Sequence, residues 1–356
     1  MMSSSKKPLA LFILFLFFFQ ASKAQTNQKI KDQLQAISED NIFISEDYFN
    51  WGGSILKGED GQYHLFYSRW PKSSQFTGWL IYSEIAHAVS DKPSGPWKYK
   101  ETVLKGRGKG HWDAITAHNP KIKNFNGKYY LYYISTNMGE DDSYSDKELQ
   151  ETSTTGYSHP NWKILRPNQR TGVAVAESLD GPWERSDKPL IEPSGPISTL
   201  TVNPAVDQGK DGRYYLIIKG DKPNDENFVR NQAMAIADSP KGPFIIQPKP
   251  VIDYMDTEDM SLWYDQTREK YYGIFHSHTF IGLVSSTDGI HWEKTEDFEI
   301  MTKAIPTLRG EDIKPDRMER PFVYQEQGIV KVLGLACKVG NESFIVTIPV
   351  KENAQY

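Results

Sequence analysis

The chain has 356 residues and a formal net charge of −5, from 41 Lys and Arg against 46 Asp and Glu. Basic residues are spread along the sequence and form no stripe or cluster. This balance argues against a nucleic-acid partner and against binding to an anionic membrane surface.

The first residues have the pattern of a secretory signal. Two lysines precede an apolar run from Leu9 to Phe19, and Ser22 and Ala24 are small residues at the −3 and −1 positions of a cleavage site. The run is too short to span a bilayer. We expect a signal peptide over residues 1–24 and a secreted or periplasmic protein of charge about −8 with no membrane span after cleavage. An uncleaved anchor is the alternative.

A single cysteine, Cys337, occurs in the chain, so no intramolecular disulfide can form. Its neighbours, Val-Leu-Gly-Leu-Ala, are typical of a buried strand. We interpret Cys337 as an inert core residue, because no activating cation is close to it in sequence.

One pattern recurs five times at intervals of 56 to 84 residues. Each copy opens with a short segment that leads into an apolar strand, and an aromatic strand follows after a turn. The five openings are Gly52–Leu56, His118–Ile122, Val202–Val206, Glu258–Trp263 and Glu319–Val323. A third strand and a turn such as Gly-Pro-Trp complete four copies.

Repetition of strands at this period, with little helical periodicity, predicts an all-β, five-bladed β-propeller. Residues 25–40 would form a short N-terminal arm, and residues 41–356 the propeller. The outer strand of the last blade is expected over Ser343–Val350. The segment Asn41–Ser45 could pair with it, which would close the ring and remove a free sheet edge.

In a propeller the first strands of all blades surround a central channel, and their first residues gather at one mouth. The loops between second and third strands border the same mouth, and the longest of them spans Thr136–Arg170. A loop of this length is either a functional lid or disordered. Several polar residues fall at these positions: Asp113, His118, Asn119, Asn203, Glu258, Asp259, Glu319 and Arg320.

Further candidates for substrate contact are expected at the rim of the mouth. Trp51 and Trp70 could stack on a sugar ring, and Arg69 could bind a sulfate or carboxylate group. His276 and His278, two residues apart, suggest a metal, but no third ligand accompanies them. We therefore predict no catalytic metal and no required cofactor, and regard the central channel as a candidate site for a structural divalent cation.

The blade openings resemble those of the five-bladed propeller glycoside hydrolases of families 43 and 117, over about residues 40–350. Family 43 has a catalytic Asp on the first inner strand, where this chain has Asn50-Trp51-Gly52-Gly53. The family 117 pattern is the closer one. It implies catalytic carboxylates at Asp113, Asp259 and Glu319, although Glu311 and Asp312 stand where that family has a His as acid.

The roles of these carboxylates remain open. Asp259 could be a base, an acid or a turn residue. Glu319 could be catalytic or only the ion-pair partner of Arg320, and Glu258 could serve as the acid. His118, Asn119, Asn203, Glu258, Arg320, Arg69, Trp51, Trp70 and His276 are candidate substrate-binding residues.

The sequence therefore predicts a secreted, exo-acting glycoside hydrolase that removes a terminal sugar from algal or plant oligosaccharides, as a monomer or homodimer. One alternative is a propeller that binds sugar without catalysis. Another is a related phosphorylase, in which Arg69, His118 and Arg320 would hold phosphate.

Overall fold

The structure is a computed structural model that describes residues 29–140, 143–225 and 229–351. The expected signal peptide and the first residues of the expected arm lie outside the described residues. None of the helices in the described ranges has the length and hydrophobicity needed to cross a membrane.

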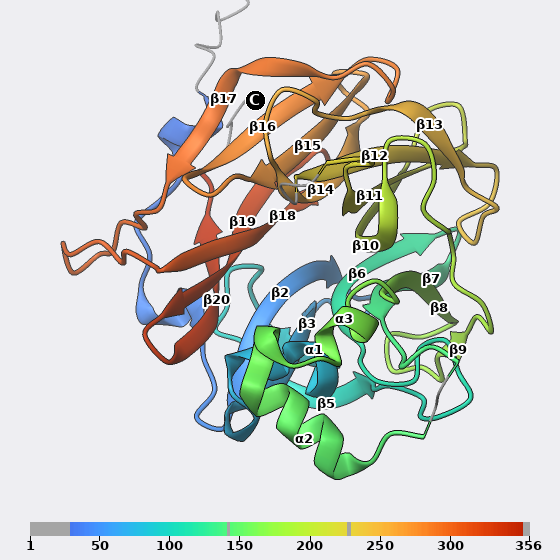
Figure 1. Ribbon diagram of the computed structural model, residues 1–356. Coiled ribbons are helices and arrows are strands. Elements are labelled where there is room, and N and C mark those ends of the chain that lie inside the picture. The colour runs from blue at the N-terminus through green and yellow to red at the C-terminus, as the bar shows by residue number, and fades with distance from the viewer. Residues whose placement is uncertain (1–28, 141–142, 226–228, 352–356) are drawn as a thin grey trace, which may run out of the picture.

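Five antiparallel sheets of four strands each surround a central axis, and the first strand of each sheet lies nearest to it (Figure 1). The five-bladed propeller predicted from the repeat is confirmed. Blades one and two contain β2 (Tyr48–Lys57), β3 (Tyr63–Pro71), β4 (Glu84–Ser90), β5 (Lys98–Leu104), β6 (His118–Phe125), β7 (Lys128–Ser135), β8 (Arg170–Ala176) and β9 (Glu184–Arg185).

The other three blades follow the same order from the axis outward. They contain β10 (Ser198–Gln208), β11 (Tyr214–Asp221), β12 (Arg230–Ala237), β13 (Ile245–Pro250), β14 (Glu258–Asp265), β15 (Lys270–His276), β16 (Phe280–Ser286), β17 (Glu293–Thr302), β18 (Arg317–Glu326), β19 (Ile329–Val339), β20 (Glu342–Pro349) and β1 (Ile42–Phe43).

The ring is closed by β1, which pairs with β20 as the outermost strand of blade five. The predicted pairing of Asn41–Ser45 is thereby confirmed. Two short 3-10 helices, η1 (Ile30–Gln33) and η2 (Glu39–Asn41), precede β1, and Ile30 of η1 is buried in the core of blades four and five.

Apolar side chains fill the space between neighbouring blades, because each sheet presents alternate residues to the blade on either side. Between blades one and five, for example, Tyr67 packs with Phe322 and Ile345. Cys337 on β19 is fully buried in the next such layer, as its sequence context predicted.

The long segment between β7 and β8 is folded over one mouth of the ring (Figure 1). It carries α2 (Asp146–Thr155), η5 (Gly156–Ser158) and α3 (Trp162–Leu165). A capping box starts α2: the Glu148 N–H donates to Ser145 Oγ, and the Ser145 N–H donates to Glu148 Oε2. The described part of this loop is therefore structured, and its role as a functional lid stays a prediction.

This segment packs on a second insertion between β3 and β4, which contains η3 (Lys72–Ser74), η4 (Phe76–Gly78) and α1 (Trp79–Tyr82). Ser153 Oγ donates to the Ser74 carbonyl at 2.5 Å, and Thr77 Oγ1 donates to the Ser153 carbonyl at 2.8 Å. The two insertions therefore form one rigid wall on the mouth of the propeller.

Ring closure can be tested with two valine truncations in blade five. Val346 on β20 is fully buried opposite Ile42 of β1, whereas Val339 at the end of β19 is 41% exposed. We expect Val346→Ala to lower the free energy of unfolding by about 2 kcal/mol, because it removes buried methyl groups at the closing seam. Val339→Ala should leave it nearly unchanged. Equal effects of the two variants in urea titrations would contradict this packing.

Candidate active site

The same irregularity occurs near the start of all five first strands. A β-bulge interrupts each pairing with the second strand, and the residue inside the bulge has a left-handed backbone with φ between 53° and 61°. These five residues, which we call the axial residues, are Gly52, Asn119, Asn203, Asp259 and Arg320. Asn and Asp tolerate this conformation better than most residues, and Arg does so rarely.

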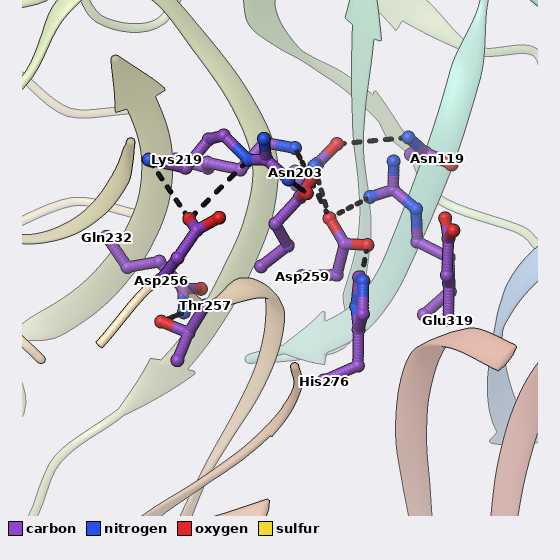
Figure 2. Close-up of polar contacts among 12 residues, drawn as sticks. Asn119, Asn203, Lys219, Gln232, Asp256, Thr257, Asp259, His276 and Glu319 are labelled. Atoms are coloured by element: carbon purple, nitrogen blue, oxygen red, sulfur yellow. Dashed lines mark hydrogen bonds and ion pairs between the residues drawn. The ribbon is translucent and has the colours of Figure 1, made fainter. Parts of the chain in front are cut away.

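The axial residues meet across the ring, as Figure 2 shows around Asp259. Asp259 Oδ1 accepts from Asn203 Nδ2 at 2.5 Å and lies 3.0 Å from Arg320 Nη1. Asn119 Nδ2 lies 3.0 Å from Asn203 Oδ1. Gly52 suits its position through its backbone, because a φ of 58° is a conformation that glycine adopts without strain.

Positive charges hold the axial carboxylate ionised. Burial alone would raise the pKa of Asp259, but Arg320, Lys219 and His276 together hold that pKa well below its usual range. His276 Nδ1 lies 3.1 Å from Asp259 Oδ2. Burial lowers the pKa of His276, but the charge and hydrogen bond of Asp259, together with the charges of Glu319 and Glu258, raise that pKa overall, which favours an imidazolium.

A cavity of about 380 Å³ lies directly above the axial residues. The residue that precedes each axial residue contributes to its lining: Trp51, His118, Val202, Glu258 and Glu319. The predicted convergence of the blade openings on one mouth is therefore what the structure shows. The volume of the cavity is within the range of small-molecule binding sites.

One side of the cavity is aromatic. Trp51, Trp70, Phe76 and Trp79 come from blade one and its insertion, and Tyr157 and Trp162 come from the long segment of blade two. These side chains provide flat apolar faces of the kind that stack on sugar rings.

His118 stands between the aromatic wall and the axial residues. Its Nδ1 lies 2.7 Å from Ser83 Oγ, and its ring packs 5.1 Å from that of Trp79. Burial, followed by the charge of Arg320, lowers the pKa of His118 well below its usual range, so the ring is neutral at ordinary pH.

Charged residues also line the cavity, and Arg317 lies beside the aromatic wall, 5.4 Å from the centre of the Phe76 ring. Glu258 contacts Lys219 and Arg230, and Glu319 Oε1 accepts from Arg317 Nε at 2.6 Å. Burial would raise the pKa of Glu258, but the Lys219 charge and its neighbours lower it to about 2.

Asp259, His276 and Glu319 each place one donor atom within 4.8 Å of the other two. Their charges are already compensated, because Arg320 contacts Asp259 and Arg317 contacts Glu319. His276 and His278 do not form a pair, since His276 is buried and His278 is 69% exposed beside Asp256.

The central channel below the axial residues contains a basic side chain. Lys121 lies directly below the axial residues, with Nζ 3.4 Å from the Gly53 carbonyl oxygen. Burial and the nearby Arg320 lower the pKa of Lys121 to about 7. Lys121 and Arg320 thus place two basic groups near Asp259, and a structural divalent cation in the channel stays a prediction.

Two predicted site residues lie elsewhere. Asp113 is completely buried behind blade two, where it contacts Arg107 at 2.5 Å, Arg185 at 3.2 Å and the Tyr133 hydroxyl at 2.8 Å. Its expected place at the mouth was wrong, because the Asp113 side chain contacts Arg107 and Arg185 instead of lining the cavity.

Arg69 is also absent from the cavity. Its Nε donates to Glu84 Oε1 at 2.8 Å, and its guanidinium group lies between the rings of Tyr48 and Tyr99. The predicted contact of Arg69 with substrate or phosphate is therefore not supported, because these neighbours within blade one already occupy its donors.

Sequence reasoning missed several cavity residues: Lys219, Arg230, Arg317, Trp162, Arg166 and Asp221. Arg317 stands two residues before Glu319 on the same strand, and that spacing could have indicated it. Arg166 and Asp221 form an ion pair at 2.6 Å between two blades, which no local pattern reveals.

No protein-family model and no curated protein matches the sequence. Solved structures do match it. Zg3597, a family 117 glycoside hydrolase from the marine bacterium Zobellia galactanivorans, has 18% identity and a TM-score of 0.58, covering 89% of this chain and 88% of its own.

An endo-arabinase from Bacteroides thetaiotaomicron has 14% identity and a TM-score of 0.55, covering 88% and 98% of the two chains. CoXyl43, a family 43 β-xylosidase/α-arabinofuranosidase from a compost microbial metagenome, has 12% identity and a TM-score of 0.58, covering 90% and 96%. The structural neighbours are thus glycoside hydrolases, as the sequence resemblance implied, and at these identities they establish the fold.

The axial ion pair makes a prediction for stability. Arg320→Met should lower the free energy of unfolding at neutral pH by about 3–5 kcal/mol, because it leaves the Asp259 carboxylate buried with less compensation. The Asp259 pKa is depressed in the native protein, so the stability this provides is present above the pKa of the unfolded state and is lost as pH falls.

The difference between wild type and Arg320→Met should therefore be fully present at pH 7 and should shrink only below about pH 4, the ordinary range of an Asp pKa, in denaturant titrations. Arg309→Met, which breaks an exposed ion pair with Glu39, is the control and should have little effect at either pH. A pH-independent difference at Arg320 would contradict the assigned charge state of Asp259.

Proposed function

We propose that this chain is a secreted, exo-acting glycoside hydrolase that removes a terminal sugar from algal or plant oligosaccharides. The observation that carries the proposal is the convergence of three carboxylates, from Glu258, Asp259 and Glu319, beside an aromatic wall in one cavity. Glycoside cleavage uses a carboxylic acid on one side of the scissile bond and a carboxylate on the other.

The charges around the three carboxylates suggest separate roles. Asp259 and Glu258 are held ionised by their cationic neighbours, so neither suits proton donation. Glu319 lines the cavity and pairs with one cation, Arg317, whereas Glu258 pairs with Lys219 and Arg230, and Asp259 with Lys219 and Arg320. We assign Glu319 as the general acid that protonates the leaving glycosidic oxygen.

Water would then attack the anomeric carbon and lose its proton to an ionised carboxylate. Glu258 suits this role better than Asp259, because it is partly exposed to the cavity whereas Asp259 is 4% exposed. Asp259 contacts Asn203, Arg320 and His276 through both oxygens, which suits a residue that sets the charge state of its neighbours.

The closed end of the cavity supports exo-action. The axial residues form its floor, and the insertions that carry α1, α2 and α3 form a wall. A cavity blocked below and on one side would admit the end of an oligosaccharide more readily than the middle of a chain.

A sugar-binding protein without catalysis is the second candidate. It is favoured by the cation beside each cavity carboxylate: Lys219 and Arg230 at Glu258, Arg320 at Asp259, and Arg317 at Glu319. In the phosphorylase alternative Arg69 was one of three residues expected to hold phosphate, and it lies outside the cavity. Product formation that depends on added phosphate would be needed to support this alternative.

Hydrolysis should depend on the cavity carboxylates. We expect Glu319→Gln to lower the rate of sugar release by about 10²–10⁴-fold, the usual contribution of a general acid. Asp259→Asn should also lose most activity. The measurement is mass spectrometry of products from agar, carrageenan, ulvan and xylan oligosaccharides.

The matched control is Glu326→Gln, at the far end of the same strand as Glu319, where the carboxylate contacts Lys57 and Tyr63. This variant should keep full activity. Oligosaccharide binding measured by calorimetry with no product from wild type would favour the binding protein, and full activity in both Glu319→Gln and Asp259→Asn would exclude the assigned roles.

A further inference from the structure

A second cluster of polar residues lies far out on the ring, where blades one and two meet. His87 on β4 and Glu101 on β5 are directly opposite each other in the sheet, and His87 Nδ1 lies 3.5 Å from Glu101 Oε1. Asp180, in the turn between β8 and β9 of blade two, faces the same point. One donor atom from each of the three residues lies within 4.8 Å of the other two.

A chain of hydrogen bonds orients the His87 ring. His64 Nε2 lies 3.1 Å from Asp60 Oδ1, and His64 Nδ1 lies 2.8 Å from His87 Nε2. A carboxylate can only accept, so neutral His64 carries its proton on Nε2 and accepts on Nδ1. His87 must then donate from Nε2, which leaves a lone pair on its Nδ1.

That lone pair points at two acids. His87 is completely buried, and its Nδ1 has no hydrogen-bond partner among the described residues. The unprotonated Nδ1 and the Glu101 and Asp180 carboxylates are three hydrogen-bond acceptors placed close together. Leaving a buried acceptor without a donor costs free energy of folding. A cation at this point would satisfy all three.

The surroundings hold the ring in this orientation. Phe66 stacks on His87 with ring centroids 4.5 Å apart and 13° between the planes. Gly58 makes room for the hydrogen-bonded pair behind it, since a Cβ at that position would lie 2.5 Å from both Asp60 Oδ1 and His64 Nε2. A histidine ligand whose other nitrogen bonds a fixed partner is a common arrangement in metal sites.

We propose that His87, Glu101 and Asp180 bind a divalent transition-metal ion, of which Zn²⁺ is the representative, and that the ion links blade one to blade two. One imidazole and two carboxylates suit such an ion better than Ca²⁺ or Mg²⁺, which prefer oxygen ligands throughout. The Glu101 and Asp180 side chains are 41% and 60% exposed, so they are free to adjust and the ion has a path from solvent.

One nearby charge opposes the ion. Lys100 precedes Glu101 on β5 and contacts Asp180. The ammonium group must turn away from Asp180 when the metal binds, so Lys100 weakens the site. A variant that lacks the Lys100 charge should therefore bind the metal more tightly, whereas a variant that lacks a ligand should bind it more weakly.

The test is calorimetric titration of chelator-treated, full-length protein with Zn²⁺. Wild type should bind one ion per chain, and its melting temperature should rise with Zn²⁺ concentration. Glu101→Gln and Asp180→Asn should each weaken binding at least about 10-fold, and Lys100→Gln should strengthen it. These three positions lie at the surface, so the test does not depend on whether a His87 variant folds.

His291→Gln is the matched control, because His291 and Asp288 form an exposed pair at 2.7 Å that could bind metal adventitiously. It should leave the affinity unchanged. No Zn²⁺ binding by wild type, or binding that is insensitive to both Glu101→Gln and Asp180→Asn, would overturn the proposal.

Discussion

The structure of the candidate site depends on a carboxylate that is buried on the propeller axis. Asp259 is almost completely buried, so its charge must be compensated by groups that the fold brings to it. Arg320, Asn203 and His276 provide this compensation from three different strands. The ring must therefore close with these strands in register before the site can exist.

Left-handed bulges at the five blade openings make this arrangement possible. Each bulge turns one side chain toward the axis and the preceding side chain toward the cavity, so that neighbouring residues serve different purposes. At Glu258 and Asp259, and again at Glu319 and Arg320, the first residue lines the cavity and the second completes the charge network beneath it. The stability of the axis and the chemistry of the cavity are thus linked through adjacent residues.

The fold could be predicted from the sequence because the repeat is local: all five blades show a similar opening, four have an aromatic second strand, and three have a Gly-Pro turn. The blade openings were also recognisable, and Asp259, Glu319, His118 and Trp51 do reach the mouth. The failures have one cause. Arg69 and Asp113 have partners, such as Glu84 and Arg185, whose positions depend on how strands and blades pack.

The same cause explains why the bulges and the cations of the cavity were not foreseen. A left-handed Arg at position 320 contradicts local preference and is stabilised by its contact with Asp259 on another blade. Lys219 and Arg166 come from strand ends and a helical insertion with no sequence relation to the carboxylates they accompany. Their placement follows from tertiary structure alone.

The most direct test of this account is a crystal structure of the Glu319→Gln variant soaked with an oligosaccharide mixture. The account predicts a terminal sugar ring against the aromatic wall, with its glycosidic oxygen next to residue 319 and Glu258 on the other side of the ring. A sugar bound on another face of the propeller, with the cavity filled only by water, would contradict it.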